Sequence, residues 1–177
     1  MLSTETRVFY NKMEADLLRY KLEVLLESKK EAETRGVEFD DYEFKNLKAE
    51  CRQLYITAIE EGEVMETTNT LKMGMLLNYS VFLYEICESV EDARFIAKKT
   101  FDEALKDLIK LNEFEAEATL PVMQALKDNF DLWETEVMSD KKKSEQAELK
   151  EQERIKKMQM DAYQKEIGEA GKSEEVE

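Results

Sequence analysis

Apolar side chains recur every three or four residues along most of the chain, and this spacing is typical of α-helices that bury one face. Gly36 and Gly62 follow the first two such stretches, and we expect both residues to end helices. Asp40 and Glu43 have the spacing of a capping box, so Asp40 is expected to cap the second helix. The five predicted helices cover about residues 4–34, 40–61, 67–88, 89–111 and 119–137.

The apolar stripes predict how these helices pack. The third helix is apolar over most of its circumference, which is typical of a helix inside a bundle. Ser89 and Asp92 open the fourth helix, and Asn112 marks its end. Pro121 is the only proline, and we expect it in the first turn of the fifth helix, where its missing N–H costs no hydrogen bond. The fold class is therefore all-α, an antiparallel array of five helices plus a charged C-terminal helix.

The composition changes after residue 138. Residues 139–167 are mostly Lys, Glu, Gln and Met, which predicts a solvated, charged helical extension. Residues 168–177 are expected to be a disordered acidic tail. Residues 1–138 form the helical domain in this interpretation.

Charge and composition narrow the function. The net charge is −15, so nucleic acid and anionic membrane surfaces are poor partners. The chain contains no His, which excludes imidazole-based triads and His-bearing metal sites. No nucleotide-binding glycine motif occurs, and we expect neither an enzyme nor a bound cofactor or metal. Cys51 and Cys87 are expected to be reduced thiols, and the protein is expected to be soluble and cytoplasmic.

One arrangement of residues suggests a binding site. Lys12 and Arg19 are seven residues apart and therefore share a helix face, with Tyr20 beside Arg19. A guanidinium, an ammonium and a phenol together could bind an oxyanion. Asn78 and Glu85 are likewise seven apart, and an Asn amide can bind the main chain of an extended ligand. The alternatives are ordinary surface cations and a buried amide with its hydrogen bonds satisfied.

Four segments resemble helices of one known family, the 14-3-3 proteins. Residues 7–24 (RVFYNKMEADLLRYKLEV) resemble the fifth helix of that family, and residues 71–86 (LKMGMLLNYSVFLYEI) resemble the seventh. Residues 97–113 (AKKTFDEALKDLIKLNE) are similar to the eighth helix, and residues 123–136 (MQALKDNFDLWETE) to the ninth. The order of the segments is that of the family, whose members are cup-shaped dimers that bind phosphoserine or phosphothreonine peptides.

The resemblance implies a role for particular residues. Arg19 and Tyr20 would hold phosphate, with Lys12 nearby. Asn78 and Asn129 would bind the peptide main chain, accompanied by Glu85 and Trp133. The apolar wall of the groove would consist of Leu77, Val81 and Leu120.

The chain also departs from the family pattern. It begins at the fifth helix, so the helices that supply the dimer interface and two further phosphate ligands are expected to be absent. Losing two charge-assisted bonds of roughly 1.5–3 kcal/mol each could weaken phosphate binding by a factor of hundreds. Pro121 and Ala125 replace larger aliphatic residues of the wall, and Lys72 stands where Arg is common.

Two hypotheses follow. The first is a phosphopeptide-binding adaptor or regulatory protein of the 14-3-3 type, whose partners are phosphorylated protein segments. The alternative is a degenerate 14-3-3-like structural subunit of a larger protein assembly. In both, the uncovered face of the first helix is expected to contact a protein partner or a second copy of the chain.

Overall fold

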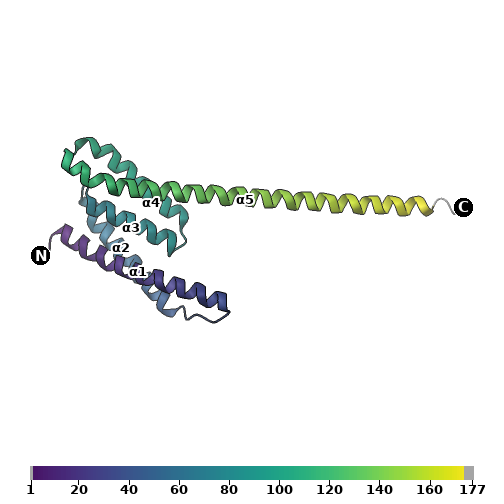
Figure 1. The fold of residues 1–177 in the computed structure, drawn as a ribbon, viewed down its shortest axis with the longest axis horizontal. Coiled ribbons are helices and arrows are strands. Elements are labelled where there is room, and N and C mark those ends of the chain that lie inside the picture. Colours follow the sequence, from purple (N-terminus) through teal and green to yellow (C-terminus); the bar gives the residue numbers. More distant parts are fainter. Residues whose placement is uncertain (1, 174–177) are drawn as a thin grey trace. The chain divides into compact units, whose positions relative to one another are not determined.

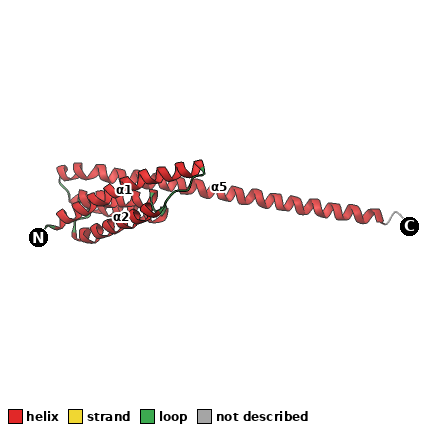
Figure 2. Ribbon diagram, turned by 90° about the horizontal axis from the view of Figure 1, so that it is seen from below, coloured by secondary structure: helices red, strands yellow, loops and turns green. Residues whose placement is uncertain are grey.

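Every regular element in the described part of the chain is helical (Figures 1 and 2). The computed structural model describes the backbone of residues 2–173 and the side chains of residues 2–160. The α-helices are α1 Thr4–Arg35, α2 Tyr42–Glu61, α3 Thr70–Glu85, α4 Val90–Asp107 and α5 Glu113–Ser173, and short 3₁₀ turns follow α2 and α4. The all-α class and the five-helix array are confirmed. None of the described helices combines the length and apolar character needed to cross a membrane.

The chain divides into two units, Met1–Trp133 and Glu134–Glu177, and α5 contributes to both. In the second unit every described side chain from Met138 onward is exposed. Pairs three residues apart, such as Lys143 with Asp140 at 3.0 Å, decorate this surface.

The predicted charged helix is not a separate sixth helix. It continues α5 because residues 139–167 are mostly strong helix formers and contain no Gly or Pro. Residues 168–173 of the expected disordered tail are the last residues of α5, and residues 174–177 lie outside the described residues.

Three apolar clusters hold the first unit together, and α3 contributes to each of them; the smallest contains Val8, Ala58 and Met75. The first core joins α1, α2 and α3, and it contains Leu22, Tyr55 and Phe82 at zero exposure. The second joins α3, α4 and α5 through residues such as Met73 and Leu126. A helix that packs on both sides must be apolar nearly all round, as the sequence pattern of α3 predicts.

Several helix ends follow from local sequence. Gly36 ends α1 with φ 67°, and its N–H and that of Val37 donate to carbonyls of the last turn. Ser89 precedes α4, as expected. The prediction that Asp40 caps α2 is wrong in position, because Asp41 is the N-cap residue; the Asp40 carboxylate still accepts a hydrogen bond from the Tyr42 N–H at 2.9 Å.

The start of α5 is also earlier than predicted. Asn112 and Glu115 form a reciprocal capping box, in which each side chain accepts the backbone N–H of the other at 3.0–3.1 Å. The helix therefore begins at Glu113, and Pro121 lies inside it rather than in its first turn. Local capping outweighs the cost of a proline within the helix.

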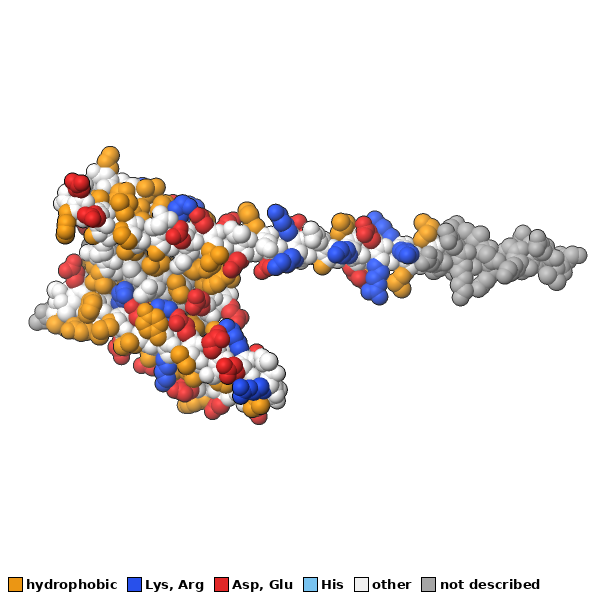
Figure 3. Space-filling model, in the orientation of Figure 1, with side chains coloured by type: hydrophobic (Ala, Val, Ile, Leu, Met, Phe, Trp, Pro, Cys, Tyr) orange, Lys and Arg blue, Asp and Glu red, His pale blue; other side chains and the backbone are white. Residues whose placement is uncertain are grey.

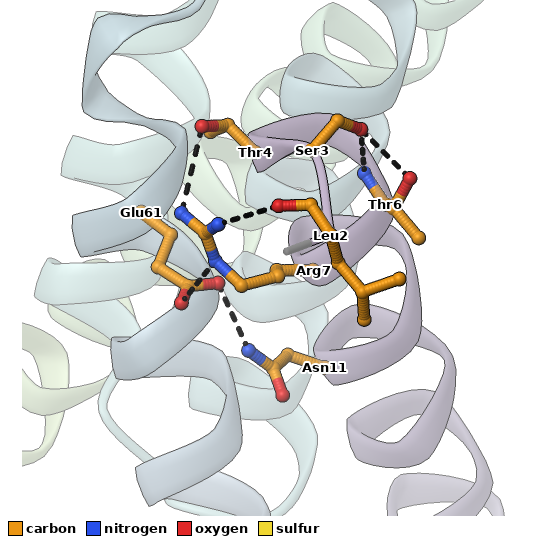
Figure 4. A network of polar contacts seen from close by, with 7 residues as sticks. All are labelled: Leu2, Ser3, Thr4, Thr6, Arg7, Asn11 and Glu61. Atoms are coloured by element: carbon orange, nitrogen blue, oxygen red, sulfur yellow. Dashed lines mark hydrogen bonds and ion pairs between the residues drawn. The ribbon is translucent and has the colours of Figure 1, made fainter.

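A polar cluster fastens the beginning of α1 to the end of α2 (Figure 4). Arg7 Nε donates to Glu61 Oε1 at 3.0 Å, and Asn11 donates to the other oxygen of Glu61 at 3.1 Å. Arg7 also donates to the Leu2 carbonyl at 2.9 Å. The two oxygens of the Glu61 carboxylate thus accept hydrogen bonds from two side chains that are one turn apart on α1.

Two glycine substitutions should change stability in opposite directions. Gly36→Ala should destabilise the protein by about 1 kcal/mol, because its φ of 67° is unfavourable for a residue with a β-carbon. Gly74→Ala should stabilise it by about 0.5–1 kcal/mol, because Gly74 lies inside α3 and a β-carbon there would meet only Lys12 Cε at 3.8 Å. Urea unfolding of both variants measures the difference, and equal signs would contradict the assignment.

Candidate functional site

Four charged side chains alternate in sign along one face of α1. Lys12, Asp16, Arg19 and Glu23 are spaced by four, three and four residues, so they form one row along the helix. We call them the α1 row. All four are buried or half-buried, although charged side chains on an isolated helix normally face water.

Asp16 is the most connected member of the α1 row. One carboxylate oxygen accepts a hydrogen bond from Lys12 Nζ at 2.6 Å, and the other accepts one from the Tyr55 hydroxyl at 2.6 Å. Asp16 is 9% exposed and Tyr55 is fully buried on α2. A carboxylate in this position is stabilised because both oxygens have a donor, one of them charged.

Arg19 is held in a similar way. Its side chain pairs with Glu23 one turn later, and its guanidinium lies 4.4 Å from the centre of the Tyr20 ring. Burial works to lower the pKa of this guanidinium, but Tyr55 and Glu23 offset the burial and the pKa is raised overall. Arg19 is 7% exposed, and its Nε has no hydrogen-bond partner among the described residues.

The α1 row faces α3. Lys12 Cε lies 3.8 Å from the position that a β-carbon on Gly74 would occupy. Further along, burial and the nearby Glu23 raise the pKa of Glu85, while Arg19 works to lower it. Asn78, one turn after Gly74 on the same face, is half-buried between these two contacts.

A surface cleft of about 580 Å³ adjoins the Arg19 end of the row. Its walls come from α1 and from the last residues of α3 and the turn after it: Glu23, Leu26, Glu27, Lys30, Tyr84, Glu85 and Glu88. Four of these side chains are acidic and one is basic. The cleft therefore favours a cationic group close to the position where Arg19 and Lys12 favour an anion.

The predicted apolar wall adjoins the same face of α3, because Val81 is three residues after Asn78 and four before Glu85. Leu77 and Val81 pack against the core that contains Trp133, which is 4% exposed. The Trp133 ring stacks on Tyr84 with centroids 4.7 Å apart. Tyr84 also lines the acidic cleft, so it contacts both the cleft and the Trp133 ring.

The remaining predicted residues lie on α5. Asn129 is half-buried one turn before Trp133, so the two share a helix face. Leu120 is half exposed and lies about 20 Å before Trp133 along the helix axis. The structure thus brings Lys12, Arg19 and Glu85 together across α1 and α3, and it places Leu120 far from Trp133.

Sequence reasoning missed two members of this site. Asp16 could have been found, because it has the i, i+4 spacing to Lys12 that permits an ion pair. Tyr55 carries no such signal, since it is far from α1 in sequence and reaches Asp16 only through the packing of α2 against α1.

Both cysteines are free thiols. Cys51 is buried, and its thiol contacts the Ala15 carbonyl oxygen at 3.3 Å. Burial raises the pKa of Cys51 to about 12, so this thiol is protonated at neutral pH and is a packing group of the first core.

The protein is thus an antiparallel array of helices, and a row of ion-paired side chains on α1 faces α3. A sequence model of the family described as 14-3-3 protein matches residues 1–134. The chain belongs to the 14-3-3 protein family.

Individual relatives agree with the family match. The chain is 37% identical to a 14-3-3 protein homolog of Encephalitozoon cuniculi (strain GB-M1) over 80% of this chain and 51% of the relative. It is 36% identical to the 14-3-3 protein beta/alpha of Gallus gallus, and equally to that of Pongo abelii, over 77% of this chain and 50% of each relative. The chain therefore spans about half the length of the curated relatives it matches.

Removing the Tyr55 hydroxyl should reveal how much the buried carboxylate depends on it. Tyr55→Phe leaves one oxygen of Asp16 without its donor and should lower the free energy of unfolding by about 1.5–3 kcal/mol. Tyr42→Phe is the matched control, because Tyr42 is 73% exposed and should change stability little. Urea unfolding compares the two, and equal effects would argue against a structural role for the Tyr55–Asp16 bond.

Ionised Glu85 should lower the stability of the folded protein in a pH-dependent way. Its pKa is raised in the folded state by burial and by Glu23, so the folded protein loses stability as pH rises through that pKa. Glu85→Gln should therefore raise the melting temperature at pH 7, and the gain should shrink to nothing at pH values below the unfolded-state pKa. Glu60→Gln, an exposed control on α2, should show no such trend. A pH-independent gain would contradict the explanation.

Proposed function

We propose that the chain is a non-enzymatic adaptor that binds protein segments containing phosphoserine or phosphothreonine. In this proposal Lys12 and Arg19 bind the phosphate together with the Tyr20 hydroxyl. Such a protein would act in the cytoplasm, where its clients are phosphorylated. The observation that carries the proposal is the position of Lys12 and Arg19 on the one face of α1 that is turned toward α3.

The electrostatics of the α1 row suit an exchangeable anion site. Glu23 already occupies part of the Arg19 fork, and Asp16 holds the Lys12 ammonium. A carboxylate and a phosphate compete for the same donors, and a phosphate dianion carries more charge. A phosphate group would therefore replace Glu23 at the guanidinium, while Asp16 keeps Lys12 extended. The guanidinium Nε, which has no hydrogen-bond partner among the described residues, is a further donor on this group.

The main chain of the ligand would be bound by one amide on α3 and one on α5. Asn78 is half-buried close to the α1 row, and Asn129 lies on α5 one turn before Trp133. Leu77 and Val81 would supply apolar contacts for side chains that flank the phosphorylated residue. Glu85 and Trp133 would complete this groove, and Leu120 would contact only a longer segment of the ligand.

Binding of a labelled peptide tests the proposal. A fluorescent phosphoserine peptide should bind more tightly than its unphosphorylated twin, as measured by fluorescence anisotropy. Arg19→Ala should lower the affinity for the phosphopeptide by roughly 10- to 100-fold, because a charge-assisted hydrogen bond contributes about 1.5–3 kcal/mol.

Arg35→Ala is the matched control, because it removes a guanidinium from the exposed end of the same helix and should leave the affinity unchanged. Equal affinity for the two peptides would sink the proposal and favour a structural subunit instead. Circular dichroism of the Arg19 variant separates lost binding from lost folding.

A further inference from the structure

Four lysine side chains line one cleft near the C-terminal end of α1. The cleft has a volume of about 480 Å³, and its walls come from the last turns of α1, the first turns of α2 and the end of α3. Its basic side chains are Lys29 and Lys30 of α1 and Lys45 and Lys48 of α2. We call it the lysine cleft. Figure 3 shows basic and acidic side chains close together near this end of α1.

The charge of the lysine cleft differs from that of the whole chain. Its lining contains the four lysines and three carboxylates, those of Glu33, Asp41 and Glu88, which gives a net charge of +1. The chain as a whole has a net charge of −15. The cleft is therefore a local cationic site on an acidic protein, and it is the kind of place where an anion would bind.

The contacts within the chain leave part of this cationic capacity unused. Asp41 is shared between Lys29 at 3.1 Å and Lys45 at 3.8 Å. Lys48 Nζ donates to the carbonyl of Ile86 at 2.8 Å, and this half-buried ammonium forms no ion pair with any described residue. An ammonium has three N–H donors, so Lys48 has two further donors for a ligand. A charged donor binds an anionic oxygen more strongly than a neutral one.

Helix electrostatics account for only part of the cluster. Lys48 contacts the C-terminal end of α3, where a cation is favourable. Lys45, in contrast, lies in the first turn of α2, where the helix dipole makes a cation unfavourable. The two lysines are also three residues apart on one helix, so their charges repel each other. An anion bound between them would offset both effects.

The lysine cleft adjoins the acidic cleft beside Arg19. Leu26, Lys30 and Glu88 line both of them. Arg19 and Lys30 are eleven residues apart, which is close to three helical turns, so they share a face of α1. The distance between them along the helix axis is roughly 16 Å at 1.5 Å per residue. An extended peptide covers that distance with about five residues.

We infer that the lysine cleft binds a second phosphate group on the same protein segment, about five residues from the phosphorylated residue that binds Arg19. This inference rests on the proposed function and extends it to doubly phosphorylated ligands. A phosphate monoester is the matching anion, because it carries nearly two negative charges and three acceptor oxygens and can contact several ammonium groups at once. The acidic cleft between the two sites repels a phosphate at intermediate positions.

Peptides with different phosphate spacings test the inference. A peptide with two phosphoserines five residues apart should bind at least about 10-fold more tightly than the singly phosphorylated peptide, as measured by fluorescence anisotropy. The second phosphoserine is placed on each side of the first in turn, and one of the two directions should show the gain. Phosphoserines only two residues apart should give no gain, because the second phosphate then meets the acidic cleft.

Lysine substitution tests the position of the second site. Lys45→Gln combined with Lys48→Gln should remove the gain and leave the affinity for the singly phosphorylated peptide unchanged. Lys45→Gln alone should already reduce the gain without loss of stability, because this side chain is largely exposed. Lys98→Gln combined with Lys99→Gln is the matched control, because it removes the same charge from an exposed pair on α4 and should keep the gain.

The outcomes separate this inference from the proposed function. No gain at the five-residue spacing, or a gain that persists without Lys45 and Lys48, would overturn the inference while the proposed function stands. If the singly phosphorylated peptide binds no more tightly than its unphosphorylated twin, the proposed function fails and the inference fails with it.

Discussion

A buried carboxylate, that of Asp16, fixes which face of α1 is turned toward each neighbouring helix. Asp16 is almost inaccessible to water, and an unpaired charge there would cost several kcal/mol. It is tolerated because Tyr55 and Lys12 each donate to it at 2.6 Å. Since Tyr55 belongs to α2 and packs between Tyr79 and Phe82 of α3, the carboxylate aligns α1 with both neighbouring helices.

Three different surfaces of α1 follow from that alignment. One face packs into the core through side chains such as Ala15 and Leu22. The second carries the α1 row toward α3, and the third exposes apolar side chains such as Met13 and Leu17 to solvent. A rotation of about one residue, or 100°, would exchange these faces and bury charges that have no partner. The hydrogen bonds of Asp16 therefore keep the α1 row, and with it the candidate anion site, turned toward α3.

Helix ends show how far local sequence determines this fold. Gly36 ends α1 where the sequence predicts, because αL geometry depends only on adjacent residues. Ser89 precedes α4 as predicted, but its hydroxyl donates to the Asp92 carboxylate at 2.6 Å and caps no backbone N–H. Pro121 predicts a later start for α5, but the capping box of Asn112 and Glu115 begins the helix at Glu113. The charged segment after residue 138 continues α5, because residues 139–167 are mostly strong helix formers.

The sequence by itself determined the helical class, the family and the fact that Lys12 and Arg19 share a face, because spacing along one helix sets the direction of each side chain. The structure shows that Glu23 forms an ion pair with the Arg19 guanidinium. Only the tertiary structure decided that this face meets α3 and that the Tyr55 hydroxyl donates to Asp16. Those contacts join residues that are distant in sequence, and no local spacing specifies which helix packs opposite. The exposure of Met13 and Leu17 was likewise decided by packing, since their apolar spacing alone is equally typical of a buried face.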